Sequence, residues 1–459
     1  MLNNKKIAFI FALVGAFLIG TLTSCGGGSG DGPGRDKVQK IKFLHIWSES
    51  AGEFTKITNN FMAENDDIEI ETIVSDYSNV PTYLNNQIMS NSLPDVFFYW
   101  TKQVYGYSQM DVCLPLNSYM EGWSSTFEDP ECWDLGKYNG NYYSVPFRCT
   151  GETLVYNKTL FKENGLVFPN NLEEFETLLS NLRKLSINPQ FSPFAVSGIT
   201  GGSLTDMYTA FERFLALSTG YSSDPNYSTG LLEEDETFRT YKGKCLDKLR
   251  DWNSKGYFGY ADGKTKDTTI RNFMEGNAAM LILNNNNLYL LDEMEDVELG
   301  FAAIPSPAGL DYTYLTSDYD GFSISKNTRY PEACIRFLKY LTSKDVSQAF
   351  SDSTNSVMAA GGIEYKNDTT KQVSQAMKDC SKAIFTQNES KYSTTNIDRP
   401  NSEAVLNYIL GGGNYGTGKE VAEFVWNNYY KTMRDAGFSP IPVLVNLDYS
   451  NLSWLDILK

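Results

Sequence analysis

The sequence predicts an α/β protein built on an open parallel sheet. Between residues 41 and 99, three apolar runs of strand length alternate with two stretches whose apolar residues recur at helical spacing. This β-α-β-α-β order is the unit of a parallel sheet. The composition, 41% hydrophobic and 14% aromatic, is too apolar for a disordered chain, and 459 residues suffice for two or three domains with their own cores.

Each element of this unit follows from its side-chain periodicity. Residues 41–47, 68–74 and 95–99 are predicted strands, and apolar faces at 54–62 and 83–89 predict the two helices between them. Ligands of parallel sheets bind beyond the carboxyl ends of the strands, so the residues that follow each strand are candidates for a site. They are Trp47, Ser48 and Glu49, then Asp76 and Tyr77, and finally Trp100 and Thr101.

Further along, helical patterns outnumber strand patterns. Asn171, followed by Glu174, predicts the capped start of a helix whose apolar face runs to Leu185. Other predicted helices cover 206–217, 238–255, 268–275, 331–342, 404–410 and 421–436, and predicted strands cover 278–283 and 321–325. Strands alternating with helices over this length favour an α/β architecture throughout the chain.

The first residues predict an export signal. Lys5 and Lys6 precede an apolar run at 7–20, which is too short to span a bilayer and fits the core of a secretory signal. The run ends in Leu22-Thr23-Ser24-Cys25, which resembles a bacterial lipobox. We therefore expect residues 1–24 to be a lipoprotein signal peptide, Cys25 to carry the lipid, and residues 25–40 to form a flexible tether. The mature protein is expected on the cell surface or the periplasmic face, held to the membrane by acyl chains only.

Charge and residue counts exclude several functions. A net charge of -17 argues against nucleic acid, because phosphate binding needs clustered lysine and arginine. A single histidine, His45, excludes sites that need two or three imidazoles, and in an alternating strand it is expected to be a satisfied core or interface residue. Residues 413–419 fit a nucleotide-binding loop, but Glu420 replaces the magnesium-binding hydroxyl and no strand precedes them. We expect no metal and no cofactor.

Seven cysteines include six beyond Cys25, and they show no metal-ligand spacing. An exported protein can form disulfides, so zero to three are allowed among Cys113, Cys132, Cys149, Cys245, Cys334 and Cys380. Proximity in the sequence favours Cys113 with Cys132.

The order of several short motifs resembles a known family. After the lipobox come a strand ending at Trp47, Leu93-Pro94-Asp95-Val96, Leu114-Pro115-Leu116, Tyr138 to Lys158, Phe273 to Met280, Ile304 to Gly309, Asp320 to Lys326 and Pro331 to Leu338. Each motif is weak alone, but their order covers nearly the whole mature chain. The chain resembles the extracellular solute-binding proteins of the carbohydrate class (family 1), similar to maltose-binding protein, which feed ATP-driven importers.

This resemblance implies a two-lobed, type II periplasmic-binding-protein-like fold, in which each lobe is an open mixed sheet flanked by helices. Lobe one would comprise residues 41–148 plus 298–341, and lobe two 149–297 plus 342–459. The solute would be trapped in the hinge cleft as the lobes close. The family is not catalytic, and its members deliver the solute to ABC permease subunits with their ATPase. We expect a monomer.

The resemblance also places ligand-binding candidates, and their chemistry suits sugars, whose C–H faces stack on aromatic rings while their hydroxyls bond to carboxylates, amides and guanidinium groups. These candidates are Trp47, Ser48, Glu49, Tyr99, Trp100, Arg148, Thr150, Asn284, Asn285, Asn286, Asp318 and Asp320. Trp47 and Tyr99 either line the cleft or lie buried beneath it. Where many relatives carry glycine and an aromatic residue, this chain has Asn284 to Asn287, which favours polar contacts over a second stacking surface.

Other functions remain open. A secreted glycan-degrading enzyme would share the composition but requires two carboxyl groups converging in the cleft. A surface sensor or adhesion subunit would bind the same sugar without a transporter. Within the family, a peptide or a polyamine is an alternative solute, and the negative charge suits a polyamine.

Overall fold

The computed structural model describes residues 38–76, 79–100, 107–108, 110–185, 187–198, 202–221, 234–259, 266–294, 296–310, 313–314, 316–379, 398–435 and 447–456. The predicted signal peptide, Cys25 and most of the predicted tether lie outside these residues, as do Tyr77, Thr101, the loop 260–265 and Cys380. In the described part of the chain, no helix is long and apolar enough to cross a membrane.

The predicted β-α-β-α-β unit is confirmed. β1 (Gln39–His45) is followed by α1 (Ala51–Glu64), β2 (Ile68–Val74), α2 (Val80–Met89) and β3 (Val96–Trp100). β1 pairs in parallel with both β2 and β3, and Phe43 lies opposite Thr72 on one side and Val96 on the other. Asp95 accepts a hydrogen bond from Lys42 N (2.8 Å) and one from Thr328 Oγ1 (2.6 Å), which fixes the start of β3.

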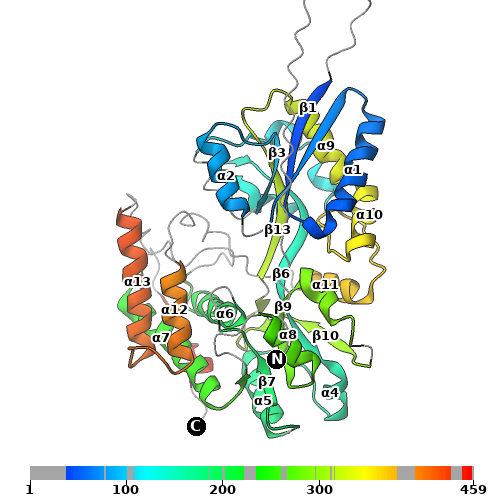
Figure 1. Ribbon diagram of the computed structural model, residues 1–459. Coiled ribbons are helices and arrows are strands. Elements are labelled where there is room, and N and C mark those ends of the chain that lie inside the picture. The colour runs from blue at the N-terminus through cyan, green and yellow to red at the C-terminus, as the bar shows by residue number, and fades with distance from the viewer. Residues whose placement is uncertain are drawn as a thin grey trace, which may run out of the picture. The chain divides into compact units, whose positions relative to one another are not determined.

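One sheet of nine strands runs through the described chain, in the order β2-β1-β3-β13-β6-β9-β7-β8 with β10 also paired to β6. Its two middle strands are long: β6 spans Val145–Asn157 and β13 spans Thr316–Ile324. Figure 1 shows them running from the group of elements around β1 and β3 to the group around β9 and β7. The sheet is mixed, because β13 is antiparallel to both β3 and β6.

The strand β6 was not predicted, and β13 begins five residues before the predicted strand. β13 is mostly polar, and β6 contains Pro146; both strands also contain glycine, and glycine and proline have little strand propensity. Their neighbours supply the hydrogen bonds instead, since β6 pairs with β9 over one edge and, over the other, first with β13 and then with β10.

Most of the predicted helices are found within a few residues of their expected bounds. At α5 (Leu172–Lys184), Asn171 Oδ1 accepts a hydrogen bond from Glu174 N (2.9 Å), as the cap predicts. The other predicted helices are α6 (Ser203–Ser218), α7 (Glu236–Ser254), α8 (Lys266–Met274), α9 (Pro331–Leu341), α12 (Asp398–Ile409) and α13 (Gly418–Asp435). Three further helices were not predicted: α4 (Lys158–Glu163), α10 (Lys344–Thr354) and α11 (Asp368–Asp379). The remaining strands are β4 (Lys137–Tyr138), β5 (Asn141–Tyr142), β7 (Ser192–Ala195), β8 (Phe258–Gly259), β9 (Ala278–Asn284), β10 (Leu299–Ala302), β11 (Ile304–Pro305) and β12 (Thr313–Tyr314).

Short 3-10 helices complete the described chain. They are η1 (Ser48–Ser50), η3 (Asn117–Tyr119), η4 (Ser124–Thr126), η5 (Pro130–Gly136), η7 (Asn285–Leu291) and η9 (Ser453–Leu455). The glycine-rich stretch before α13 has a packing role: Gly418 lies so close to α7 that a Cβ atom there would come 2.1 Å from the carbonyl oxygen of Gly243. Only glycine, which has no side chain, can pack this closely against α7. Packing therefore accounts for this glycine of the 413–419 pattern, and nucleotide binding is not needed to explain it.

Apolar side chains form two cores. The first core lies around β1, β3, α1, α9 and α10 and includes Phe43, Phe54 and Phe337. The second core lies among α5, α6, α7, α12 and α13 and includes Phe211 and Trp252. β9 belongs to both, because Leu281 and Leu283 join the first core while Met280 and Ile282 join the second. The lobe boundaries at 148/149, 297/298 and 341/342 remain a prediction.

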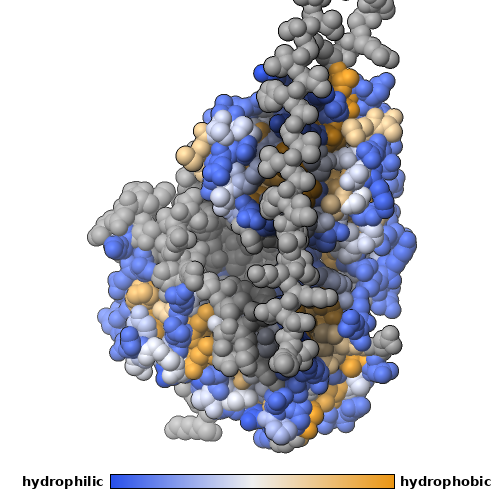
Figure 2. All heavy atoms as spheres, viewed as in Figure 1, coloured by the Kyte–Doolittle hydropathy of each residue, from blue (hydrophilic) through white to orange (hydrophobic). Residues whose placement is uncertain are grey.

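The surface in Figure 2 is largely hydrophilic over the described elements, with hydrophobic side chains at scattered places. Exposed large apolar residues are spread over several elements, from Met89 on α2 to Val167 before α5 and Tyr430 on α13. Residues exposed singly in this way are ordinary for a protein surface.

The favoured disulfide between Cys113 and Cys132 is wrong, because both are buried free thiols. Cys113 forms an isolated β-bridge with Ser325 at the end of β13, whereas Cys132 lies in η5. Closeness in the sequence did not place the two side chains together. Burial raises the pKa of the Cys113 thiol to about 12, so it stays protonated at neutral pH.

Candidate functional site

Several of the predicted ligand-binding residues lie on adjacent strands at the middle of the sheet. Trp100, the last residue of β3, lies opposite Asp320 of β13, and Asp320 in turn lies opposite Arg148 of β6. Two residues along β6, Thr150 lies opposite Asp318, and Glu152 lies opposite Asn284 at the end of β9. Segments that are far apart in the sequence therefore bring these residues together at neighbouring positions on four strands, and we call this set the central row.

Arg148 and Asp320 form a buried ion pair within the central row. Nη2 and Nε of Arg148 lie 2.8 Å and 3.2 Å from Oδ2 of Asp320, and both side chains are buried. The guanidinium also lies over the ring of Trp47, 4.8 Å from its centroid. A buried pair of this kind fixes β6 against β13, since either charge alone would be costly to bury.

The two aromatic residues whose position was left open are both buried. Trp47 stacks on Phe54 (5.3 Å, 9°) and packs edge-on against Phe98, inside the first core. Tyr99 packs against Tyr107 (4.7 Å), and burial raises its pKa well above the ordinary value. Trp100 differs from both, because its indole is only half-buried and meets Phe98 edge-on at 5.1 Å.

The two polar candidates after the first strand lie on the surface. Ser48 and Glu49 are exposed in η1, directly before α1. The strand ends at His45 rather than at Trp47, so these residues stand three and four positions beyond it.

Asn284, Asn285 and Asn286 are held against β6 by their amide groups. Asn285 Nδ2 donates to Cys149 O and its Oδ1 accepts from Gly151 N, each at 3.1 Å, so this side chain continues the pairing that β9 begins. Asn286 Nδ2 donates to Thr150 Oγ1 (2.9 Å), and Asn284 Nδ2 approaches the same hydroxyl at 3.3 Å. Thr150 is thus the point at which the asparagine run meets the central row.

Asp318 belongs to β13, where its backbone pairs with Thr150. Its side chain lies outside the described residues.

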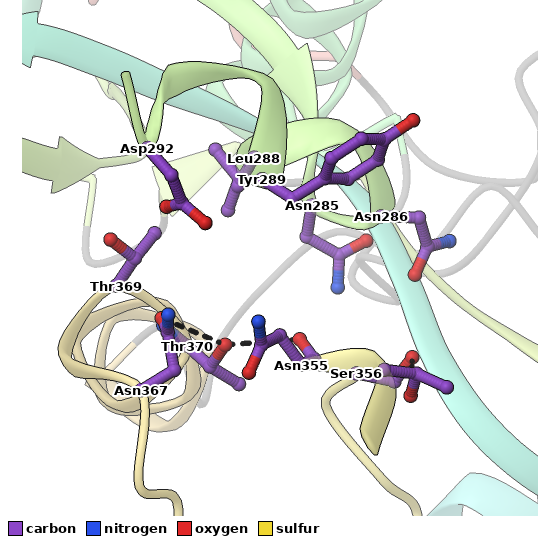
Figure 3. A pocket seen from close by; sticks show the side chains of 11 residues that line it. Asn285, Asn286, Leu288, Tyr289, Asp292, Asn355, Ser356, Asn367, Thr369 and Thr370 are labelled. Carbon is purple, nitrogen blue, oxygen red and sulfur yellow. Dashed lines mark hydrogen bonds between the residues drawn. The ribbon is translucent and has the colours of Figure 1, made fainter. Parts of the chain in front are cut away.

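A polar pocket adjoins the asparagine run. It lies between η7 and residues 354–370, which connect α10 to α11, and it holds about 290 Å³ of empty space, counting space open to solvent. Figure 3 shows the side chains of the two segments facing one another across it. The lining residues are Asn285, Asn286, Leu288, Tyr289, Asp292, Thr354, Asn355, Ser356, Asn367, Thr369 and Thr370.

Only Asn285 and Asn286 of these lining residues were predicted from the sequence. Tyr289 follows the asparagine run by two residues, and 58% of it is exposed. The sequence around it did not predict this exposure. Asn355, Asn367 and Thr370 lie in a segment without any distinctive motif. They reach the pocket because residues 357–359 pair with β6, through Cys149 N to Val357 O (2.8 Å) and Ala359 N to Phe147 O (2.9 Å).

His45 is buried at the end of β1, as expected for a core residue, but it is not satisfied: neither ring nitrogen has a hydrogen-bond partner among the described residues. Its ring stacks on Phe54 at 4.3 Å. Burial lowers the pKa of His45 to about 4, so it is neutral at pH 7. Within the described ranges, no group of three or more histidine, cysteine or carboxylate side chains is arranged to hold a metal.

Comparisons with known proteins agree with this architecture. The sequence profile of the bacterial extracellular solute-binding proteins matches residues 56–378. The multiple sugar-binding protein of Streptococcus mutans is 25% identical over 386 residues, which cover 79% of this chain and 84% of that protein.

Two solved structures share the fold. Apo RafE from Streptococcus pneumoniae has a TM-score of 0.70 at 19% identity, over 87% of this chain and 99% of the other. The sugar-binding protein MalE from Xanthomonas citri has a TM-score of 0.71 at 16% identity, over 87% and 100%. The fold is thus the predicted two-lobed, type II periplasmic-binding-protein fold. Since the matched profile covers well over half of the 459 residues, the chain belongs to the family of bacterial extracellular solute-binding proteins.

Proposed function

We propose that the chain captures a carbohydrate, an oligosaccharide by preference, closes its two lobes around it and delivers it to an ABC importer. The observation that carries this proposal is the placement of Trp100 on β3 and Thr150 on β6, with β13 between them, together with Asn286, which donates to Thr150 and lines a pocket of amides and hydroxyls. Such groups exchange hydrogen bonds with sugar hydroxyls, and a half-buried indole offers a stacking surface. Family membership supports it, as does the similarity to a protein named for binding multiple sugars.

Residues of the central row divide into two roles under this proposal. The buried pair Arg148–Asp320 is a positioning element, because it holds β6 against β13 beneath Trp100. Thr150, Asn284 and Asn286 are half-buried and offer hydrogen-bonding groups beside it. Ser48, Glu49 and Asp318 remain further candidates for ligand contacts, and the buried Trp47 and Tyr99 support the site from below.

A screen of neutral oligosaccharides by thermal shift tests the proposal. A ligand that binds only the folded state raises the melting temperature, and at 100 times its Kd it adds about 2.7 kcal/mol of stability. We expect at least one neutral oligosaccharide to raise the melting temperature of residues 25–459 and to be recovered unchanged, because the protein binds without catalysis. Stabilisation by a polyamine or a peptide, with none by sugars, would contradict the carbohydrate assignment. Release of a cleaved glycan would contradict the absence of catalysis.

Trp100→Ala probes the stacking surface. Loss of one aromatic face from a sugar site is expected to weaken affinity roughly tenfold, with the unliganded melting temperature lowered modestly. Trp426→Ala, on α13, is a matched control, since Trp426 is also half-buried but lies away from the row. An unchanged Kd for Trp100→Ala would remove that residue from the site.

The predicted lipobox completes the proposal: Cys25 carries acyl chains that hold a monomer at the outer face of the cytoplasmic membrane, beside the permease and its ATPase. Radiolabelled palmitate should label the wild type in bacterial cells and not Cys25→Ser, which should move from the membrane fraction to the soluble exported fraction. Membrane retention of the variant would show that another segment anchors the chain.

A further inference from the structure

Two buried thiols from different elements lie side by side. Cys132 belongs to η5, which packs against β6 and β13, and Cys149 belongs to β6. Both are free and buried. Their thiol groups interact electrostatically, and the buried hydroxyl of Tyr319 interacts with both and shares a hydrogen bond with the Cys149 thiol. Side chains of η5, β6 and β13 therefore meet at one place in the first core.

Backbone pairing brings η5 to this part of β6. Residues 357–361 pair with β6 on one side, where the N–H of Cys149 donates to the first of their carbonyls (2.8 Å). On the other side they pair with residues 126–128, through hydrogen bonds of 2.8 Å and 3.0 Å. The chain then turns into η5, and the N–H of Cys132 donates to Asp129 O (3.2 Å). The backbone therefore positions Cys132 relative to Cys149, and their proximity does not depend on the two side chains alone.

The thiol pair and the polar side chains of the central row lie on opposite faces of the sheet. Cys149 and Tyr319 are opposite each other on β6 and β13. Successive side chains of a strand point to opposite faces, so Cys149 points away from the side of Arg148 and Thr150. A covalent bond to Cys132 would therefore stiffen the strand that carries the central row without covering Thr150.

The other described cysteines have different neighbours. Cys113 interacts with a serine hydroxyl, Cys245 with carboxylate and ammonium groups, and Cys334 with a threonine hydroxyl at 3.7 Å. We propose that Cys132 and Cys149 form a disulfide that ties η5 to β6, made as the chain folds in the presence of a small disulfide such as glutathione disulfide. This inference is independent of the carbohydrate function proposed above.

Burial determines when this bond can form. It raises the pKa of the Cys132 thiol well above its usual range, and the neighbouring Cys149 adds to the effect, so in the folded protein this thiol is unreactive. In the folding chain, the Cys132 thiolate attacks one sulfur of glutathione disulfide and expels a glutathione thiolate. The Cys149 thiolate then attacks the Cys132 sulfur of this mixed disulfide and expels the second. The two cysteines lose two electrons and two protons, which the two glutathione molecules gain.

Oxidative refolding tests the disulfide. The mature chain with Cys25→Ser, which keeps six cysteines, is reduced, unfolded in urea and refolded with reduced and oxidised glutathione. Alkylation after denaturation should then label four cysteines rather than six, and mass spectrometry of the unreduced digest should recover Cys132 linked to Cys149. A cross-link limits the freedom of the unfolded chain, so this protein should melt a few degrees higher than protein refolded with reduced glutathione alone.

Three variants accompany this measurement. Cys132→Ala and Cys149→Ala should each lack the linked peptide and should melt at the same temperature after either refolding. Cys334→Ala is the matched control, because it removes another buried thiol of the first core; it should keep both the linked peptide and the difference in melting temperature.

The count of free thiols in the protein with Cys25→Ser alone decides the proposal, even if a variant of a buried cysteine folds poorly. Six free thiols in the folded protein would overturn the disulfide, as would a bond between two other cysteines. Equal melting temperatures for the linked and the reduced protein would overturn its role in tying η5 to β6.

Discussion

The two cores of this protein bury polar groups in different ways. Around the second core, ionised side chains are taken out of water in pairs: Lys242 lies 2.7 Å from Glu212 and 2.8 Å from Glu234, and Lys248 lies 2.8 Å from Glu176. The described residues of the first core instead bury hydroxyl groups and the neutral imidazole of His45. The buried ion pair next to this core, Arg148–Asp320, lies on the long central strands β6 and β13.

This difference predicts different sensitivities. A buried ion pair depends on both partners, since removing one leaves a charge in a medium that cannot solvate it. A neutral buried group costs less to disturb but can gain a charge when the pH changes. Substitution of a buried charged residue should therefore lower the free energy of unfolding most in the second core. In the first core, much of the pH dependence of that free energy should come from His45.

The largest effect is expected from Lys242→Met. Burial opposes the charge of Lys242, but Glu212 and Glu234 outweigh it and raise its pKa, so the ammonium is charged in the folded state. Its removal leaves Glu234, which is almost fully buried, without its cationic partner. We expect a loss of about 3–5 kcal/mol in the free energy of unfolding, measured by urea denaturation.

Lys419→Met is the matched control for this substitution. Lys419 also faces two carboxylates, Glu236 at 2.8 Å and Glu423 at 3.8 Å, but all three side chains are exposed to a substantial degree. Removing an exposed pair should cost no more than about 1 kcal/mol. Equal costs for the two variants would mean that burial of an ion pair does not determine how sensitive the second core is to substitution.

How far the sequence predicted the fold depended on how regular each segment was. Most of the helices and the apolar strands β1, β2, β3 and β9 were predicted, because their own periodicity specifies them, whereas α4, α10 and α11 were not predicted. β6 was missed, since Pro146 and Gly151 interrupt its alternation of apolar and polar residues. Its conformation comes from pairing with β13 and β9, which are more than a hundred residues away in the sequence.

The same limit applied to the candidate site. The rule that ligands bind beyond parallel strands drew attention to Trp100, which the structure places opposite Asp320, and Asp320 in turn lies opposite Arg148. It could not tell that Trp47 turns back into the first core, because β1 ends two residues earlier than its apolar run. The wall formed by Asn355 and Thr370 depends on tertiary pairing with β6, and no spacing in the sequence reports that contact.

The pH dependence of stability tests the first core. His45 has a folded-state pKa of about 4 against 6.5 for the free side chain. Between these values the unfolded chain binds a proton that the folded chain does not, so the stability present above pH 6.5 falls as the pH is lowered towards 4. From this shift we expect His45 to remove up to about 3 kcal/mol over that range.

His45→Leu separates this effect from the titration of carboxylates, which both proteins share. Leucine has a similar volume and cannot be protonated, so the variant should lose less stability than the wild type between pH 6.5 and 4, when the free energy of unfolding is followed by urea denaturation at each pH. Parallel curves for the two proteins would show that the imidazole does not carry the acid sensitivity of the first core.

The smallest effect concerns a neutral hydrogen bond of the first core. Trp123 Nε1 donates to Thr342 Oγ1 (3.0 Å), and Thr342 Oγ1 donates to Leu338 O (2.8 Å), with both side chains buried. Thr342→Val leaves the indole N–H without its acceptor and should cost about 1–2 kcal/mol by urea denaturation. Thr240→Val, on α7, removes the same kind of bond to Glu236 O from an exposed position and should change stability by less than about 0.5 kcal/mol. A cost for Thr342→Val as large as that for Lys242→Met would contradict the comparison, because a lost neutral partner would then matter as much as an uncompensated buried charge.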